Sequence, residues 1–114
     1  MTNQHANNTQ YWLEQVEKAS GLAGSNPKLA ELLGVTRSSI SHQKRGVYAM
    51  GVRSAVAAAY VLEVHPMLIV ASTQWDSAAN EQDKIFWLTT FMKWADKAPR
   101  GINPPIMALL PDQE

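Results

Sequence analysis

Apolar residues recur every three or four positions along most of the chain, which is the spacing of one face of an α-helix. Glycine and proline separate these stretches, so the pattern predicts a series of short helices joined by turns. Residues 1–8 are polar and are expected to form a flexible N-terminus. A first helix is predicted over residues 9–20, with Gly21 at its end. Its predicted inward positions are Tyr11 or Trp12, Gln15 or Val16, and Ala19.

Two short helices are predicted in succession between residues 26 and 46. Asn26 is a favoured N-cap residue and Pro27 suits the first helical position, so a helix is expected to run from there to Gly34. Its predicted inward positions are Leu29, Ala30, Leu32 and Leu33. Thr36 is the next candidate N-cap, and the helix that it opens is expected to end at Gly46, with basic residues in its last turn.

Three more helices are predicted in the second half of the chain. Residues 52–64 are rich in alanine, and their predicted inward positions are Val52, Val56, Ala59, Tyr60 and Val64. Residues 67–75 suit a strand or a helix, and their helical surroundings favour a helix, with His65 serving the loop or capping it. Residues 81–97 have apolar side chains on more than one face, so one face is expected to be left for a partner. The apolar patch at 106–110 is expected to dock on the body, cross to a second subunit or remain loose.

The predicted fold is therefore all-α, with a domain of five to six helices. A chain of 114 residues is long enough for one domain with its own core. The expected divisions are the flexible N-terminus at 1–8, a helical domain at 9–78, a C-terminal helix at 79–98 that is a candidate for dimerisation, and a proline-rich tail at 99–114.

Composition excludes several kinds of chemistry. The chain contains no cysteine, which rules out disulfides and thiolates and disfavours a tetrahedral zinc site. Its three histidines lack the spacing of metal ligands, so no metal and no cofactor are expected. The polar N-terminus does not resemble a signal peptide, and the apolar runs are too short to cross a bilayer. A cytoplasmic protein with no membrane partner is expected.

The formal net charge of the chain is zero, but the charge is unevenly distributed. Residues 25–53 contain five basic residues and one acidic residue. A basic stretch in a neutral chain suits a polyanionic partner, although a solvated helix face explains the same charges equally well. The charge pattern therefore permits a nucleic-acid partner without requiring one.

The most informative stretch is NPKLAELLGVTRSSISHQKRG, residues 26–46. Ala30 is small where two helices would cross, and Gly34 suits a turn that needs a positive φ. The apolar positions that would hold the second helix on the first are Leu29, Leu33, Val35 and Ile40. This pattern resembles the helix-turn-helix of Cro/CI-type (XRE, lambda-repressor-like) DNA-binding domains. The wider layout of the chain is similar to small regulators of phages and prophages.

The resemblance implies a lambda-repressor-like helix-turn-helix followed by an additional C-terminal helix, and it assigns roles to single residues. The residues implied to contact base edges are Arg37, Ser38, Ser41 and His42. The residues implied to contact the DNA backbone are Asn26, Lys28, Thr36, Lys44, Arg45 and Arg53. The chain departs from the family pattern at Gln43, where an apolar or aromatic residue is usual. The second helix is expected either to pack less tightly there or to have another residue fill the gap.

The function implied by the resemblance is that of a sequence-specific DNA-binding transcriptional regulator of phage or mobile-element type, in the cytoplasm of a bacterial host. Repression is the more typical role, and activation is the other. One such motif reads one half-site of double-stranded DNA, so a homodimer on a pseudo-palindromic operator is expected. The candidate residues for the dimer interface are Trp87, Phe91 and Trp94. No small-molecule ligand is indicated.

Two other classes of function compete with this one. The alternative is a protein-interaction module, antitoxin-like or anti-repressor-like, that uses the apolar C-terminal helix and the tail. The neutral net charge and Gln43 favour this alternative slightly. An enzyme is not expected, because Ser38, Ser39 and Ser41 have no paired base and acid in a recognisable motif.

Overall fold

Helices make up all of the regular structure in residues 7–111, the part of the chain that the computed structural model describes. The elements, in chain order, are α1 (Asn8–Ser20), α2 (Asn26–Leu33), α3 (Arg37–Lys44), α4 (Val52–Leu62), α5 (Pro66–Ser77), α6 (Glu81–Ala95) and a short 3-10 helix, η1 (Pro105–Leu109). The prediction of an all-α fold with five to six helices is confirmed. No helix in this range combines the length and the apolar content needed to cross a membrane.

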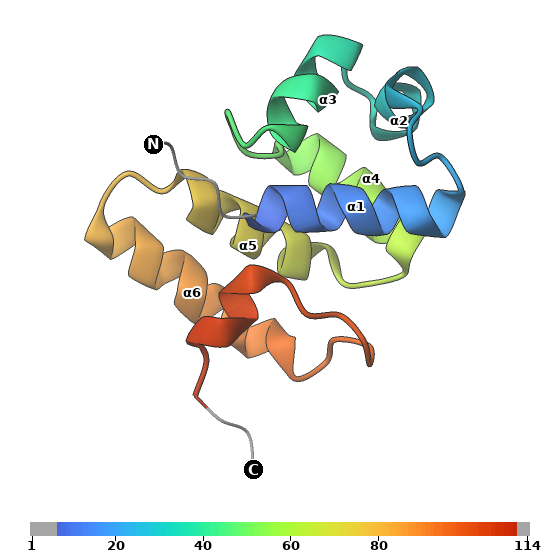
Figure 1. The fold of residues 1–114 in the computed structure, drawn as a ribbon. Helices are drawn as coiled ribbons and strands as arrows, with labels where there is room; N and C mark the ends of the chain where they lie inside the picture. The colour runs from blue at the N-terminus through green and yellow to red at the C-terminus, as the bar shows by residue number, and fades with distance from the viewer. Residues whose placement is uncertain (1–6, 112–114) are drawn as a thin grey trace.

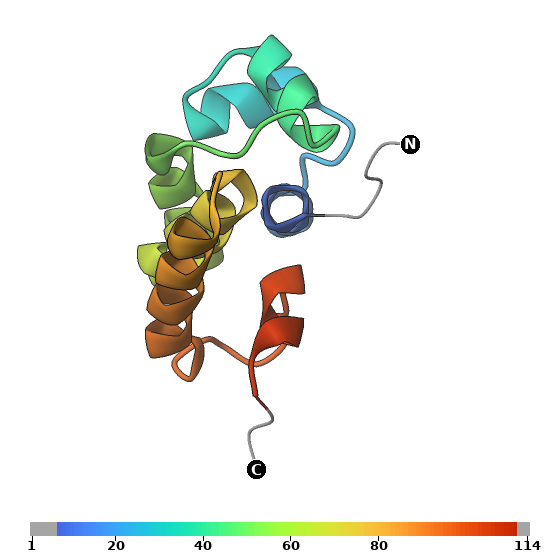
Figure 2. The same ribbon diagram turned by 90° about the vertical axis from the view of Figure 1, so that its left-hand side faces the viewer.

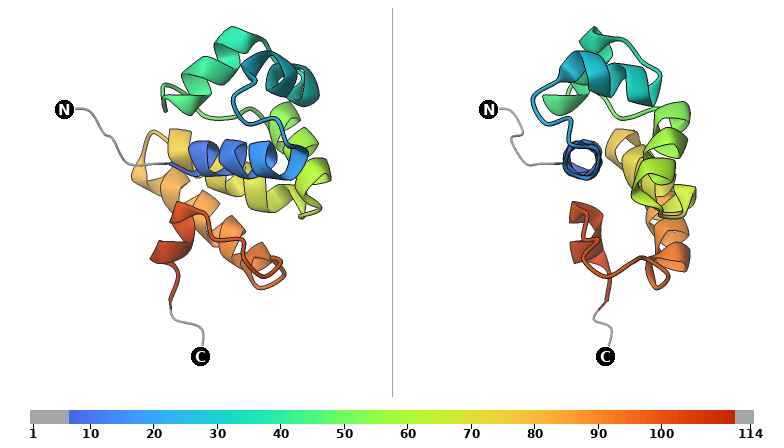
Figure 3. Two further views of the ribbon diagram at one scale, coloured as in Figure 1. Left: turned by 45° about the vertical axis from the view of Figure 1, so that its right-hand side comes forward. Right: turned by 90° about the vertical axis from the view of Figure 1, so that its right-hand side faces the viewer.

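Helix α1 runs through the middle of the molecule (Figures 1 and 2). It packs against α3, α4, α5 and η1, while α4 packs on α5 and α5 packs on α6. The pair of helices α2 and α3 lies at one end of the molecule, and α6 and η1 lie at the other (Figure 3). The two surfaces that the sequence singles out, the α2–α3 pair and the C-terminal helix, are therefore well separated.

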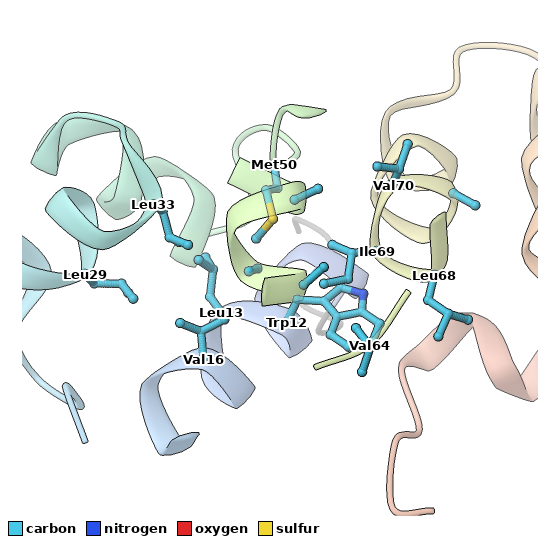
Figure 4. Close-up of a cluster of buried hydrophobic side chains, with 14 of the residues drawn as sticks. Trp12, Leu13, Val16, Leu29, Leu33, Met50, Val64, Leu68, Ile69 and Val70 are labelled. Carbon is cyan, nitrogen blue, oxygen red and sulfur yellow. The ribbon is translucent and has the colours of Figure 1, made fainter. Parts of the chain in front are cut away.

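The core forms around α1 because its apolar side chains face neighbours on two sides. Leu13 lies toward Leu33 of α2, whereas Trp12 lies toward Ile69 of α5 (Figure 4). The indole N–H of Trp12 donates to Ser72 Oγ at 2.8 Å, so the polar end of this side chain is satisfied inside the core. Other fully buried side chains are Val16, Leu29, Ile40, Met50, Leu68, Phe91 and Ile106. The core therefore draws on every helix and on the tail.

The start of α1 joins four parts of the chain. The carboxylate of Asp76, near the end of α5, accepts hydrogen bonds from the backbone N–H groups of Asn8 at 3.2 Å and Thr9 at 2.8 Å. Asn8 Oδ1 accepts from the backbone N–H of Ile106 in η1 at 2.9 Å, and Thr9 Oγ1 accepts from that of Met50 at 3.0 Å. Burial raises the pKa of Asp76 above its usual range, although the hydrogen bonds from Thr9 and Asn8 act in the opposite direction.

Two expectations for the N-terminal part are corrected. Asn8 is buried within α1, so the N-terminal segment expected at 1–8 reaches into the fold; residues 1–6 lie outside the described part. Ala19, which was expected to face inward, is exposed, and Leu13 is buried instead. The larger apolar side chain takes the inward position because it buries more surface.

In α2 and α4, the capping residue or the buried residues differ from those expected. The N-cap of α2 is Ser25, so Asn26 is the first helical residue, and Leu32 is 39% exposed. On α4, Val52 and Tyr60 are 56% and 77% exposed, contrary to expectation. The face that α4 buries consists of Ser54, Ala55, Ala58 and Ala59. Because these side chains are small, α4 can lie close to α1 and α5.

The segment after α4 is helical, as expected, and the tail docks on the body of the molecule. His65 Nδ1 accepts a hydrogen bond from the backbone N–H of Met67 at 3.1 Å and so caps α5, one of the roles predicted for it. The tail forms η1, whose Ile106 is buried. The backbone N–H of Asn103 donates to the hydroxyl of Tyr11 at 2.7 Å, which attaches the tail to α1.

Helix α6 corrects the expected dimer interface. Phe91 is fully buried within a single chain and therefore cannot contact a second copy. Trp94 is partly buried and stacks on His65 with ring centroids 3.9 Å apart, and Trp87 is also partly buried. The prediction is therefore wrong for Phe91, whereas Trp87 and Trp94 are partly exposed and remain predicted residues of a dimer interface. The large apolar side chains that α6 exposes are Ile85, Phe86 and Met92.

Candidate nucleic-acid interface

Helices α2 and α3 are joined by a tight turn whose two ends are both capped. Gly34 ends α2 with a φ of +74°, in the left-handed region that favours glycine. The N–H groups of Gly34 and Val35 both return to the carbonyl of Ala30, the second at 3.0 Å. Thr36 begins α3, and its side-chain oxygen accepts a hydrogen bond from the backbone N–H of Ser39 at 3.0 Å. These caps fix where one helix ends and the next begins.

One side of α3 holds the helix on the rest of the molecule. Ile40 is fully buried, and Gln43 is buried at the position where the resemblance would place an apolar residue. Gln43 Oε1 accepts no hydrogen bond from the described residues. Gln10 of α1 donates from its side chain to the carbonyl of Lys44 at 2.7 Å and so fastens the end of α3. The Gln43 side chain therefore occupies the buried site where the family has an apolar residue, and its side-chain oxygen is left without a hydrogen bond, which is unfavourable.

The opposite side of α3 faces outward. Arg37 and Ser38 are exposed, Ser41 and His42 are partly exposed, and Arg45 is exposed directly after the helix. At about 100° per residue, positions 38, 41, 42 and 45 share one face and position 37 lies at its edge. The four residues implied to contact bases are thus brought together on one outward surface.

A tyrosine that sequence reasoning missed extends this surface. Tyr48, in the loop between α3 and α4, is 46% exposed and stacks on His42 with ring centroids 5.5 Å apart. Its hydroxyl lies 3.0 Å from Ser39 Oγ. His42 Nδ1 lies 2.8 Å from the carbonyl oxygen of Ser38, and a proton donated there leaves Nε2 of the neutral ring as an outward acceptor. The signal in the sequence was an aromatic residue inside a glycine-flanked turn.

Exposed basic side chains lie at both ends of α3 and on its neighbours α2 and α4. Lys28 on α2 is exposed, and so are Arg37 and Arg45 at the two ends of α3. Arg53 of α4 is also exposed and lies over the turn, since a Cβ added to Gly34 would be 3.3 Å from its Nε. Four of the predicted backbone-contacting residues therefore have exposed side chains: Lys28, Thr36, Arg45 and Arg53.

Lys44 and Asn26, both predicted to contact the DNA backbone, bond to each other in the folded chain. Lys44 Nζ forms an ion pair with Glu17 of α1 and donates to Asn26 Oδ1 at 2.6 Å. The two side chains are therefore used in tying α3 to α1 and α2. The charge of Lys44 is already compensated by Glu17, which leaves it a weak partner for a phosphate.

The outward face of α3 carries polar and basic side chains. Its histidine, His42, bonds to the backbone carbonyl of Ser38. Within residues 7–111 there is no group of three His, Asp or Glu side chains that could hold a metal ion. The chain was compared with known protein families, with curated proteins and with solved structures, and no match was found in any of the three.

Proposed function

We propose that this chain is a sequence-specific DNA-binding transcriptional regulator of the Cro/CI (lambda-repressor-like) type. In this proposal α2 and α3 form the helix-turn-helix, and α3 is the recognition helix. The observation that carries the proposal is the division of α3 into two sides. Ile40 and Gln43 anchor one side, while the other presents short polar and basic groups to solvent.

The chemistry of the outward face suits the major groove of double-stranded DNA. The guanidinium of Arg37 can donate two parallel hydrogen bonds to guanine O6 and N7. Ser38 and Ser41 can bond to several base edges, and His42 has a ring nitrogen free of its bond to Ser38. In this proposal the exposed Lys28, Arg45 and Arg53 neutralise phosphates, which supplies affinity that does not depend on sequence.

The regulator acts as a homodimer in this proposal. A single helix-turn-helix reads one half-site, and two half-sites about 34 Å apart on one side of the duplex give adequate specificity. The operator is then pseudo-palindromic, and repression follows where it overlaps a promoter. The wider layout of the chain is similar to small regulators of phages and prophages, so the proposal is a regulator of phage or mobile-element type in the cytoplasm of a bacterial host.

A titration of the purified chain against the DNA upstream of its own gene tests the proposal. The experiment uses fluorescence anisotropy at two salt concentrations, with a scrambled duplex of the same length as control. Tight binding that favours the upstream DNA and weakens steeply with salt is the expected result. The absence of binding to either duplex at low salt would contradict it.

A protein-interaction module, antitoxin-like or anti-repressor-like, is the second candidate. The observation in its favour is the apolar surface of α6 and η1, where Ile85, Phe86 and Leu109 are each more than half exposed. A folded chain that binds neither the upstream duplex nor the scrambled duplex would support this alternative.

A further inference from the structure

We infer that His42 recognises an exocyclic amino group on a base edge, that of adenine or cytosine, and that Tyr48 is the positioning residue that orients it. The inference rests on the proposed function, in which α3 lies in the major groove, and it names what one position of each half-site contains. On the strand that His42 faces, the base is adenine or cytosine rather than guanine or thymine. One of its two tests contains no DNA, so the inference and the proposed function can fail separately.

The proton of the neutral His42 ring lies on Nδ1. This nitrogen is 2.8 Å from the carbonyl oxygen of Ser38, one turn back along α3. A carbonyl oxygen only accepts hydrogen bonds, so Nδ1 must be the donor. A neutral imidazole carries one proton on its two nitrogens, and Nε2 is therefore left with a lone pair. His42 thus presents an acceptor to the DNA, whereas the guanidinium of Arg37 presents donors only.

Tyr48 holds the plane of this ring. The two rings stack with centroids 5.5 Å apart and planes inclined by 19°. The hydroxyl of Tyr48 is hydrogen-bonded to Ser39 Oγ at 3.0 Å, so the tyrosine is itself attached to α3 at its far end. The imidazole is therefore restrained by a hydrogen bond at its edge and by an aromatic ring on one face. A group that is ordered before binding loses less entropy when it binds.

Tyr48 reaches His42 because of the way α3 ends. Gly46 has a φ of +76°, in the left-handed region that favours glycine. The backbone N–H of Val47 donates to the carbonyl of His42 at 2.9 Å, and that of Gly46 donates to the carbonyl of Gln43 at 3.0 Å. These two bonds form a Schellman motif, which closes the helix and redirects the chain. Tyr48 follows this motif directly and so lies beside the last turns of α3.

The pair lies on the surface that would meet DNA. Tyr48 is 46% exposed, His42 is partly exposed, and Ser38, one turn back on the same face, is exposed. In the major groove, adenine N6 and cytosine N4 are donors, while guanine O6 and thymine O4 are acceptors at the corresponding positions. A lone pair at Nε2 bonds to the first two bases and leaves two acceptors facing each other at the last two. His42 therefore distinguishes amino bases from keto bases.

Nuclear magnetic resonance of the free chain tests the position of the proton. The shifts of the two ring nitrogens of His42 are measured at about pH 8, where an imidazole ordinarily carries no charge. We expect the proton on Nδ1 in the wild-type chain and in Tyr48→Phe, which keeps the stacked ring, and a mixture of tautomers in Tyr48→Ala. Tyr60→Ala is the matched control, because Tyr60 is 77% exposed on α4 and should not affect the ring. A proton on Nε2 in the wild-type chain, or equal shifts in Tyr48→Ala and Tyr60→Ala, overturns the inference.

Selection of bound duplexes from a random library, at the same pH, tests the base preference. The wild-type chain should enrich adenine or cytosine at one position of each half-site. Replacing that base by purine or pyrimidinone, which lack the amino group, should weaken binding about three- to tenfold. His42→Lys presents donors only and should change this position alone to guanine or thymine. Tyr48→Ala should lose the preference there, whereas Tyr48→Phe and Tyr60→Ala should keep it, and circular dichroism confirms that each variant is folded.

The outcomes of the selection separate the two proposals. A wild-type chain that enriches no sequence overturns the proposed function and the role of His42 with it. A wild-type motif that His42→Lys leaves unchanged at every position, or one with guanine or thymine at the position that changes, keeps the proposed function and overturns the inference. Equal effects of Tyr48→Ala and Tyr60→Ala on the motif would overturn the role of Tyr48 as a positioning residue.

Discussion

Arg37 and Arg45 are both exposed at α3, but they are expected to behave differently when replaced. Arg37→Ala should cost about 1–3 kcal/mol of operator binding and relax the preference at one base pair, because it removes a bidentate contact to a base. Arg45→Ala should weaken binding to operator and random DNA alike and reduce the salt slope by about one. Anisotropy titrations at several salt concentrations measure both effects. An equal loss on the two DNAs for Arg37→Ala would mean that this side chain contacts only phosphate.

Lys44 is expected to matter for stability rather than for DNA binding. Its partner Glu17 has a side chain that is 15% exposed, so Lys44→Met leaves a poorly hydrated carboxylate without a counter-charge. The free energy of unfolding should fall by about 1–3 kcal/mol. Lys18→Met is the matched control, because the exposed Lys18–Glu14 pair, 3.8 Å apart, should contribute about 0–1 kcal/mol. Urea unfolding measures both, and equal effects would contradict the role assigned to Lys44.

Sequence reasoning placed single residues well where the cause is local and poorly where it is not. Thr36 was predicted as an N-cap because a threonine before a helix carries its own acceptor, and the structure confirms it. The resemblance implied that Arg37 and Ser38 face outward, and both are exposed in the structure. The ion pair of Lys44 was not predicted, because its partner Glu17 lies on another helix and no local pattern reports it. Tyr48 was missed for the same reason, since its importance comes from stacking on His42.

At the scale of elements, the turn between α2 and α3 depends on Gly34 in two separable ways. Because Gly34 has a φ of +74°, Gly34→Ala should lower the free energy of unfolding by about 1–2 kcal/mol. The added Cβ would also lie 3.3 Å from Arg53 Nε and displace that side chain. Gly21→Ala is the control, because Gly21 has a φ of +73° and no described atom within 4 Å of an added Cβ. We expect both variants to lose similar stability in thermal melts. Gly34→Ala alone should weaken DNA binding, and a similar loss for Gly21→Ala would remove Arg53 from the interface.

Helical periodicity predicted the elements more reliably than the faces that they bury. The helix at 67–75 was favoured over a strand because its neighbours are helical, and α5 confirms it. The prediction for the inward face of α4 was wrong at Val52 and Tyr60, because large apolar side chains outweigh alanine in a hydrophobic pattern, whereas Ala59 is buried as predicted. Packing instead selected the small face, which lets three helices approach closely. Similarly, Phe91, one of the three aromatic residues predicted on α6 as a dimer contact, is buried in the core of the single chain.

At the scale of the whole molecule, contacts between distant segments decide what periodicity left open. The sequence allowed the tail to dock, to cross to a second subunit or to remain loose. It docks because Asn8 Oδ1 accepts a hydrogen bond from Ile106 and because the Ile106 side chain fills the core. The same asparagine binds Asp76 of α5 through its side-chain amide at 2.9 Å. Such a junction joins residues that lie far apart in the chain, and helical patterns do not report it.

The contact between Asp76 and the start of α1 predicts that the stability of the whole molecule depends on pH. Burial raises the pKa of Asp76, so this carboxyl binds a proton more readily in the folded chain than in the unfolded one. A group shifted in this direction favours the folded state below its unfolded pKa, and that contribution is lost as pH rises through the folded pKa. The wild-type chain should therefore gain stability relative to Asp76→Asn, a neutral variant of the same shape, as pH falls from neutral through the range where carboxyls titrate. Urea unfolding of both proteins at a series of pH values gives the difference in free energy of unfolding, in which the other carboxyls cancel. Parallel profiles, or a wild-type chain that loses stability relative to the variant on acidification, would show that the hydrogen bonds from Asn8 and Thr9 outweigh the cost of burial.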